Sequence, residues 1–169
     1  NTSFYKIENG NRVCYSPHTG TYVSTVVKGQ ESAFIVMKNF AGQTIWKNSS
    51  CFTYHLGDDV IGLEWYTKMG SIGGEVLEGI QKSIALAEEK YKGLVIANDG
   101  ANFSAGANVA MIFMMAIEQD YDEIDMAIRQ FQQTMMRVRY SSIPVVLAPH
   151  GLALGGGCEM SLHADKVIA

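Results

Sequence analysis

Two short stretches, Phe103-Ser104-Ala105-Gly106-Ala107-Asn108 and Gly155-Gly156-Gly157-Cys158-Glu159, carry most of the information in this sequence. Each follows an apolar run typical of a buried strand, so we expect each to form the loop at the carboxyl end of that strand. Small residues in such loops let a ligand approach the backbone N–H groups closely. Two of these groups, one from each loop, can hold a single developing oxyanion, and the carboxylate that follows Gly156 can move a proton.

The segments around these loops alternate between strand and helix patterns. A hairpin is expected at Cys51–Leu56 and Val60–Trp65, on either side of the turn signal Gly57-Asp58-Asp59. Apolar residues at helical spacing predict helices over 72–90, 108–117 and 124–138, and a further helix after Gly157. Short apolar strands are predicted over 94–97, 145–148 and 166–169. This alternation is typical of parallel β/α units, so the predicted fold class is α/β.

The first 47 residues differ from the rest of the chain. Turn signals at Glu8-Asn9-Gly10 and His18-Thr19-Gly20 lie between short β-rich pieces such as Thr21–Val27 and Ala33–Met37. No pattern in this part points to chemistry. We therefore predict a connector or small β-rich appendage over residues 1–47 and a second domain over residues 48–169. Because the chain opens without Met and stops in a strand-like run, we expect it to be a piece of a longer protein.

Composition and charge exclude several classes of function. The chain has 169 residues, 47% hydrophobic content and a net charge of −4, which describes a globular protein without a basic face for nucleic acid. Its three cysteines are widely spaced, which favours reduced thiols and a cytoplasmic protein. Cys158 and His163 are two potential ligands, too few for a zinc site. No stretch is long and apolar enough to cross a bilayer, so we expect no membrane partner. The ligand count and the charge likewise lead us to expect no metal and no nucleic-acid partner.

Each of these features also has a simpler interpretation when it is taken alone. The glycine run fits a tight strand-to-helix turn, and Glu159 fits a solvated carboxylate that the helix dipole favours in a first turn. The sequence contains neither the dinucleotide-binding fingerprint G-x-G-x-x-G nor the G-K-[ST] of a P-loop. Ser104 lacks the G-x-S-x-G elbow of serine hydrolases. The methionine-rich segment 111–115 is interpreted as core packing, with the wall of an acyl pocket as the alternative.

The two loops together are more specific, and they closely resemble the enoyl-CoA hydratase/isomerase (crotonase) superfamily. The resemblance rests on Phe103–Ala107, on Pro144-Val145-Val146, on Ala153–Glu159 and on the spacing between the loops. It implies a crotonase-like ββα spiral, truncated at its C-terminus, with a small N-terminal β-rich appendage. The preceding segment, with Thr21-Tyr22-Val23 and Trp46-Lys47, looks like the connector of multifunctional 3-hydroxyacyl-CoA dehydrogenase/enoyl-CoA hydratase proteins.

The resemblance also implies roles for individual residues. The N–H groups of Ala107 and Gly156 would form the oxyanion hole, and Glu159 matches the first catalytic glutamate of the family. The residues expected along the path of the substrate or of CoA are Ala105, Gly106, Val109 and Gly155. Two positions depart from the family pattern, because Asn108 stands where Asp is usual and Pro149-His150-Gly151 replaces the more usual Asn-Gly.

The implied reaction is hydration of 2-enoyl-CoA to 3-hydroxyacyl-CoA in fatty-acid β-oxidation, through an enolate held in the oxyanion hole. Two alternatives stay open, an enoyl-CoA isomerase and a non-catalytic CoA-binding or assembly module, since the second glutamate of hydratases would fall after Ala169. The expected partner is an acyl-CoA thioester. No cofactor is expected in this segment, NAD would serve a fused dehydrogenase domain outside it, and a homo-oligomer is expected only of the full-length parent.

Overall fold

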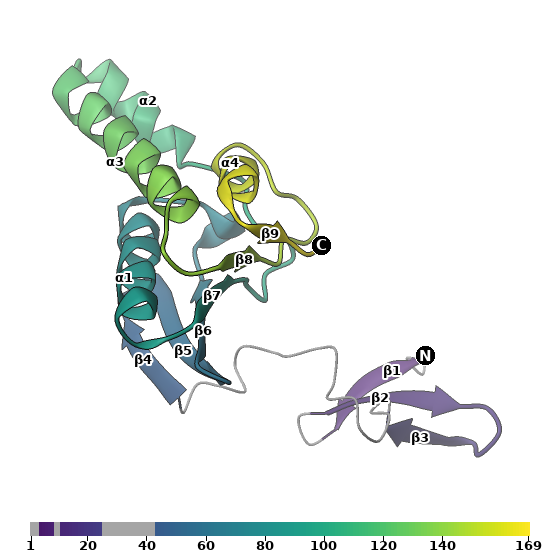
Figure 1. Ribbon diagram of the computed structural model, residues 1–169. Coiled ribbons are helices and arrows are strands. Elements are labelled where there is room, and N and C mark those ends of the chain that lie inside the picture. Colours follow the sequence, from purple (N-terminus) through teal and green to yellow (C-terminus); the bar gives the residue numbers. More distant parts are fainter. Residues whose placement is uncertain (1–3, 9–10, 25–42) are drawn as a thin grey trace. The chain divides into compact units, whose positions relative to one another are not determined.

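The computed structural model describes residues 4–8, 11–24 and 43–169, and the chain divides into two units between Asn39 and Phe40 (Figure 1). The first unit contains a three-stranded antiparallel sheet in the order β1-β2-β3. Its strands are β1 (Tyr5–Glu8), β2 (Asn11–Ser16) and β3 (Thr21–Ser24). The strand predicted over residues 33–37 lies outside the described residues.

The second unit contains a six-stranded mixed sheet in the order β4-β5-β6-β7-β8-β9. Its first three strands are antiparallel, and they are β4 (Thr44–Lys47), β5 (Cys51–Gly57) and β6 (Val60–Trp65). The others run parallel to β6, and they are β7 (Gly93–Ile96), β8 (Val145–Leu147) and β9 (Lys166–Val167). The predicted hairpin and the three predicted apolar strands are therefore all present.

The segment at 44–47 belongs to the larger sheet, although the sequence boundary placed it with the first 47 residues. β4 pairs with β5 through Trp46 and Thr53. Ile45 and Trp46 are partly buried and pack against the core of the second unit. Burial of these two side chains explains why the observed division falls before residue 40.

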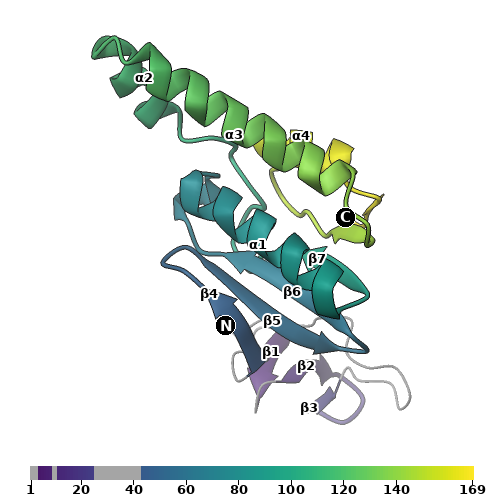
Figure 2. The same cartoon turned by 60° about the vertical axis from the view of Figure 1, so that its left-hand side comes forward.

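Four α-helices connect the strands of the second unit: α1 (Gly74–Lys90), α2 (Val109–Ile117), α3 (Tyr121–Arg139) and α4 (Gly156–His163). Helix α1 covers one face of the sheet (Figures 1 and 2). It buries one stripe at helical spacing, made of Val76, Leu77, Ile80, Ile84 and Ala87. The C-terminal half of α3 joins this core through Met135 and Val138.

Helix α2 and the N-terminal half of α3 extend beyond the sheet as a helical hairpin (Figures 1 and 2). Asn108 caps α2, because its side-chain oxygen accepts a hydrogen bond from the N–H of Met111. Helix α2 has no buried residue, and its exposed apolar side chains include Val109, Phe113 and Ile117. An apolar helix exposed in this way needs cover that the described residues do not supply.

An ion pair joins the two long helices. Arg137 on α3 donates to Glu88 on α1 through the Nη1 and Nη2 nitrogens of its guanidinium group, with an Nη1–Oε1 distance of 2.8 Å. The N–H of Ser142 donates to the same carboxylate at 2.9 Å. Two hydrogen bonds lower the pKa of Glu88 from 4.5 to about 2. The one from Arg137 has the larger effect and the one from Ser142 the smaller. The carboxylate therefore fixes α1, α3 and the start of the loop to β8 against one another.

This pair predicts a pH-dependent contribution to stability. Because the pKa of Glu88 is lowered in the folded state, its stabilising effect is complete above pH 4.5 and is lost as the pH falls towards about 2. Glu88→Gln is expected to lower the free energy of unfolding at pH 7 by about 1 kcal/mol, a modest value because Arg137 is partly solvated. In urea unfolding measured from pH 7 down to pH 3, the difference in free energy of unfolding between wild type and Glu88→Gln should become smaller.

The neighbouring Glu89→Gln is the matched control, since within the described ranges Glu89 pairs only with the exposed Lys90 on the same helix. Its free energy of unfolding should stay within about 0.5 kcal/mol of wild type at each pH. If the difference in free energy of unfolding between Glu88→Gln and wild type did not change with pH, the ionised carboxylate of Glu88 would not be the source of the stabilisation.

Candidate active site

The peptide between Gly106 and Ala107 presents one N–H group to a cavity. The N–H of Ile72 donates to the carbonyl oxygen of Gly106 at 2.9 Å. In a planar trans peptide the C=O and the following N–H point in opposite directions, so the N–H of Ala107 points away from Ile72. This N–H has no hydrogen-bond partner among residues 43–169, and Ala107 lines the cavity.

The second N–H group comes from the start of α4. Gly156 is the first residue of this helix, where backbone N–H groups have no partner within the helix. Within residues 43–169 its N–H is unpaired, whereas the next N–H, of Gly157, donates to Leu154. Gly156 lines the same cavity as Ala107. The positive end of the helix dipole adds to the attraction of this position for an anion.

The two donors come from loops that lie in contact. A Cβ atom built on Gly106 would lie 3.0 Å from the carbonyl oxygen of Leu154 and 3.3 Å from the backbone nitrogen of Gly156. Gly106 also has a φ of +94°, which other residues rarely adopt. A glycine is therefore needed here both for the backbone conformation and for the close approach of the loops.

Glu159 brings a carboxylate to the same cavity. It lies on α4, one helical turn after Gly156, and it is half-buried. Its carboxylate makes no hydrogen bond and no ion pair with the described residues, so it is available to a ligand. The cavity, of about 560 Å³, thus receives two N–H groups and one carboxylate within a small region. This set can stabilise an oxyanion and move a proton beside it.

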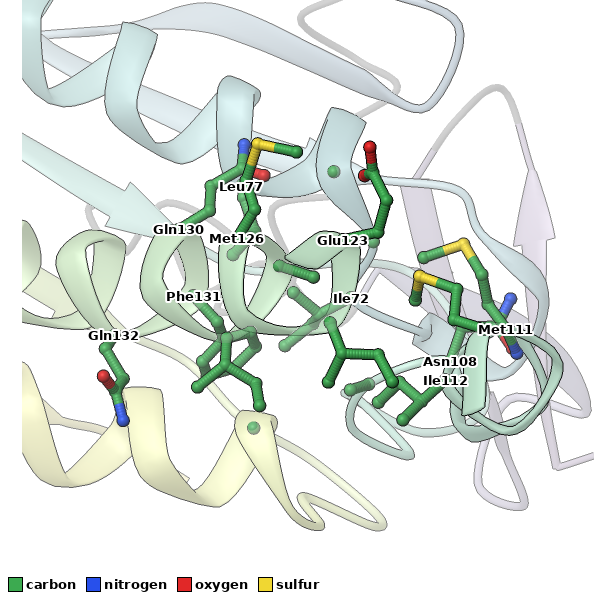
Figure 3. Close-up of a pocket in the computed structure, with 18 of the residues that line it drawn as sticks. Ile72, Leu77, Asn108, Met111, Ile112, Glu123, Met126, Gln130, Phe131 and Gln132 are labelled. Carbon is green, nitrogen blue, oxygen red and sulfur yellow. The ribbon is translucent and has the colours of Figure 1, made fainter. Parts of the chain in front are cut away.

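The rest of the cavity is largely apolar. Figure 3 shows Met111 and Ile112 from α2 on one side and Met126 and Phe131 from α3 on the other. Ile72 and Leu77 close it next to α1. Apolar walls around a few convergent polar groups are typical of small-molecule sites. They also lower the local dielectric constant, which strengthens the interaction of the N–H groups with a negative charge.

Comparison with known proteins agrees with this geometry. The family model described as enoyl-CoA hydratase/isomerase matches residues 60–169, which include both loops and Glu159. The chain belongs to the enoyl-CoA hydratase/isomerase family. The resemblance inferred from the two loops is thereby confirmed, and so are the α/β fold class and the crotonase-like architecture.

Two relatives of this family member are several times longer than the chain. A Bacillus subtilis protein named as a probable 3-hydroxyacyl-CoA dehydrogenase is 41% identical over 169 residues, which is 100% of this chain and 21% of the relative. A Rickettsia prowazekii protein, named as a candidate trifunctional enzyme of a fatty acid oxidation complex, is 35% identical over 103 residues, 61% of this chain and 14% of the relative. The chain thus spans about a fifth or less of the length of these relatives.

Solved structures of the family share the fold. The enoyl-CoA hydratase of Bacillus anthracis matches 70% of this chain and 46% of its own, with a TM-score of 0.63 and 25% identity. An enoyl-CoA hydratase from Bacillus halodurans matches 70% of this chain and 49% of its own, with a TM-score of 0.64 and 18% identity, a likeness of fold alone.

The residues predicted along the CoA path lie beside the cavity of this family member rather than in its wall. Ala105, Gly106 and Gly155 belong to the two loops, and Val109 is the first residue of α2, with 72% of its surface exposed. The residues that line the cavity include none of these four. Their contact with CoA stays a prediction.

Three residues near the site were not singled out from the sequence. Phe131 was placed in the apolar stripe of a helix, yet its ring points from α3 toward α4 in Figure 3. Glu123 and Gln130 line the cavity from the same helix. Their spacing, with Ala127 between them, is i, i+4, i+7, which puts them on one face. The available signal was this polar and small face directly beside the predicted apolar stripe of the helix.

No group of three His, Cys, Asp or Glu side chains that could hold a metal ion occurs in the described part of the chain. Among the same residues, no helix combines the length and apolar character needed to cross a bilayer.

Proposed function

We propose that this chain carries the oxyanion hole and one acid/base group of a site that hydrates 2-enoyl-CoA to 3-hydroxyacyl-CoA in fatty-acid β-oxidation. The observation that carries the proposal is the single cavity lined by Ala107, Gly156 and Glu159. The names of the relatives support hydration as the direction, because its product, a 3-hydroxyacyl-CoA, is the compound named in 3-hydroxyacyl-CoA dehydrogenase.

The geometry suits this reaction step by step. Water adds its oxygen to C3 of the conjugated thioester, and negative charge moves to the thioester oxygen as the enolate develops. The N–H groups of Ala107 and Gly156 donate to that oxygen, and each such donor is worth about 3 kcal/mol in the transition state. Glu159 moves a proton between water and substrate, and C2 gains a proton, so that H and OH are added across the double bond.

Isomerisation is the second candidate, and one observation favours it. Glu159 is the carboxylate on the helix that also carries Gly156, whereas Glu123, the other carboxylate among the described residues that line the cavity, lies on α3. A single carboxylate suffices to take a proton from one carbon of a 3-enoyl-CoA and return it to another through the same enolate. A non-catalytic CoA-binding or assembly module would use the cavity without proton transfer.

The setting of the site is also part of the proposal. We place the chain in a multifunctional, cytoplasmic protein whose dehydrogenase part, outside this segment, uses NAD. The step proposed here draws on backbone N–H groups and carboxylates alone. Assembly as a homo-oligomer is expected of the whole protein.

Titration with acetoacetyl-CoA, whose enolate resembles the reacting state, tests the proposal in the protein that carries this chain. Calorimetry is expected to show binding, and the purified protein is expected to consume 2-enoyl-CoA faster than 3-enoyl-CoA. The reverse preference would favour the isomerase. Binding without turnover of either thioester would favour the module, and absence of both binding and turnover would contradict all three candidates.

A further inference from the structure

Ser104 occupies a fully buried position between the two loops that carry the N–H groups. Its hydroxyl donates to the carbonyl oxygen of Gly70 at 2.7 Å and accepts a hydrogen bond from the N–H of Gly106 at 3.0 Å. The one donor of a serine hydroxyl is thus fully used, and so is one of its acceptor positions. The side chain does not line the cavity.

The backbone of Ser104 pairs with the second loop on both sides. Its N–H donates to Leu152 at 3.0 Å, and its carbonyl oxygen accepts from Leu154 at 2.9 Å. These two bonds form a parallel bridge between Ser104 and Ala153, which extends the pairing of the sheet past the ends of β7 and β8. The second loop is therefore fixed to Ser104 just before Gly156.

The first turn of α4 also lies directly on Ser104. A Cβ atom built on Gly157 would lie 2.7 Å from the Cβ atom of Ser104. On the other side, a Cβ atom built on Gly70 would lie 3.0 Å from the Cα atom of Ser104. The space on both sides of this serine is therefore filled by backbone, and the hydroxyl is the group that links Gly70 to Gly106.

Gly106 takes part in two successive peptide groups, and a hydrogen bond holds each of them. The N–H of Gly106 is bonded to the hydroxyl of Ser104, and the C=O of Gly106 is bonded to the N–H of Ile72. Loss of the hydroxyl would leave the N–H of Gly106 and the C=O of Gly70 without these partners. The Ala105–Gly106 peptide is then free to rotate, and it turns the adjoining Gly106–Ala107 peptide with it. A change of this kind alters the direction of the N–H of Ala107 without touching the substrate.

We propose that Ser104 is a positioning residue of the oxyanion hole, an inference that rests on the proposed function. Its hydroxyl holds the Ala105–Gly106 peptide, which adjoins the peptide that carries the N–H of Ala107, and its backbone holds the loop that leads to Gly156. Interactions that improve only in the transition state change kcat more than KM. Ser104 should therefore influence turnover more than the binding of substrate.

Ser104→Ala in the protein that carries this chain tests the inference, with Ser83→Ala as the matched control. Ser83 is also fully buried, and its hydroxyl is bonded to Thr53 at 2.8 Å, away from the cavity. Both variants lose one buried hydroxyl. For Ser104→Ala we expect kcat to fall roughly tenfold to hundredfold with KM nearly unchanged, and the Kd for acetoacetyl-CoA to rise about tenfold. For Ser83→Ala we expect wild-type values.

Equal kcat values for the two alanine variants would overturn the role of Ser104 while leaving the proposed function in place. A wild-type protein that neither binds acetoacetyl-CoA nor turns over an enoyl-CoA would overturn the proposed function itself, and this inference with it. Where Ser104→Ala does not fold, Ser104→Cys replaces it, since a thiol is close in size and a weaker hydrogen-bonding group. An intermediate kcat for Ser104→Cys supports the inference, and a wild-type kcat overturns it.

Discussion

Replacing Glu159 with glutamine is expected to lower kcat for hydration by roughly 10²–10⁴-fold, the range for loss of a positioned acid/base group. The amide has the size of the carboxylate but cannot accept and return a proton. Because the carboxylate has no partner among the described residues, the change should leave the fold and the affinity for acetoacetyl-CoA largely intact. Steady-state kinetics and calorimetry on the same preparation separate the two effects.

Glu123→Gln is the control for this experiment, because Glu123 is the other carboxylate that lines the cavity. It lies on α3, and its exposed side chain belongs to a different part of the wall. We expect its effect on kcat to be far smaller than that of Glu159→Gln. An unchanged kcat for Glu159→Gln would remove Glu159 from the mechanism, and a larger effect at Glu123 would transfer the role to that residue.

Gly156→Ala is expected to lower kcat by about 10²-fold or more, because it disturbs a donor of the oxyanion hole. A Cβ atom at this position would lie 2.3 Å from the Cζ atom of Phe131, well inside van der Waals contact. Either the ring or the first turn of α4 must then move. A shift of the N–H by a fraction of an ångström is enough to weaken a donor that must face the enolate oxygen.

A double-mutant cycle with Phe131→Leu identifies the cause of that loss. Leucine removes the aromatic carbon atoms that the new methyl group would meet, so the double variant should recover part of the kcat lost in Gly156→Ala. Cys158→Ala serves as the control in the same helical turn, since Cys158 is exposed and does not line the cavity. Additive losses in kcat for the two substitutions would show that Phe131 does not restrict position 156.

Periodicity predicted the helices and the parallel strands well because burial selects apolar residues at fixed spacing. Helix α1 illustrates this, since its stripe from Val76 to Ala87 packs on the sheet as its pattern indicates. The two loops and Glu159 were also found from the sequence, because a run of small residues after a buried strand indicates a close approach of backbone or ligand. The structure places Ala107, Gly156 and Glu159 around one cavity, and their roles in catalysis stay predictions.

The sequence could not reveal which segments pack against one another in the folded chain. The methionine-rich segment was expected to pack in the core, with the wall of a pocket as the alternative. Met111 and Met115 line the cavity, in agreement with the alternative, and Met114 is exposed. An apolar run without a polar face indicates burial, yet it does not identify the covering partner. Likewise, Ser104 is an ordinary small residue in the sequence, and its hydrogen bonds become apparent only when Gly70 and Leu152 are brought beside it.

The N–H donors and the apolar wall of the cavity come from different parts of the chain, because much of the wall belongs to the helical hairpin that extends beyond the sheet. The backbone donors are fixed by pairing between residues 103–106 and 150–154, close to the ends of β7 and β8. Much of the apolar wall comes from residues 111–128, which lie between these two segments in the sequence and outside the sheet. Under the proposed function, exchanges in that hairpin are therefore expected to change the preferred acyl group while the N–H groups proposed to hold the thioester oxygen keep their positions.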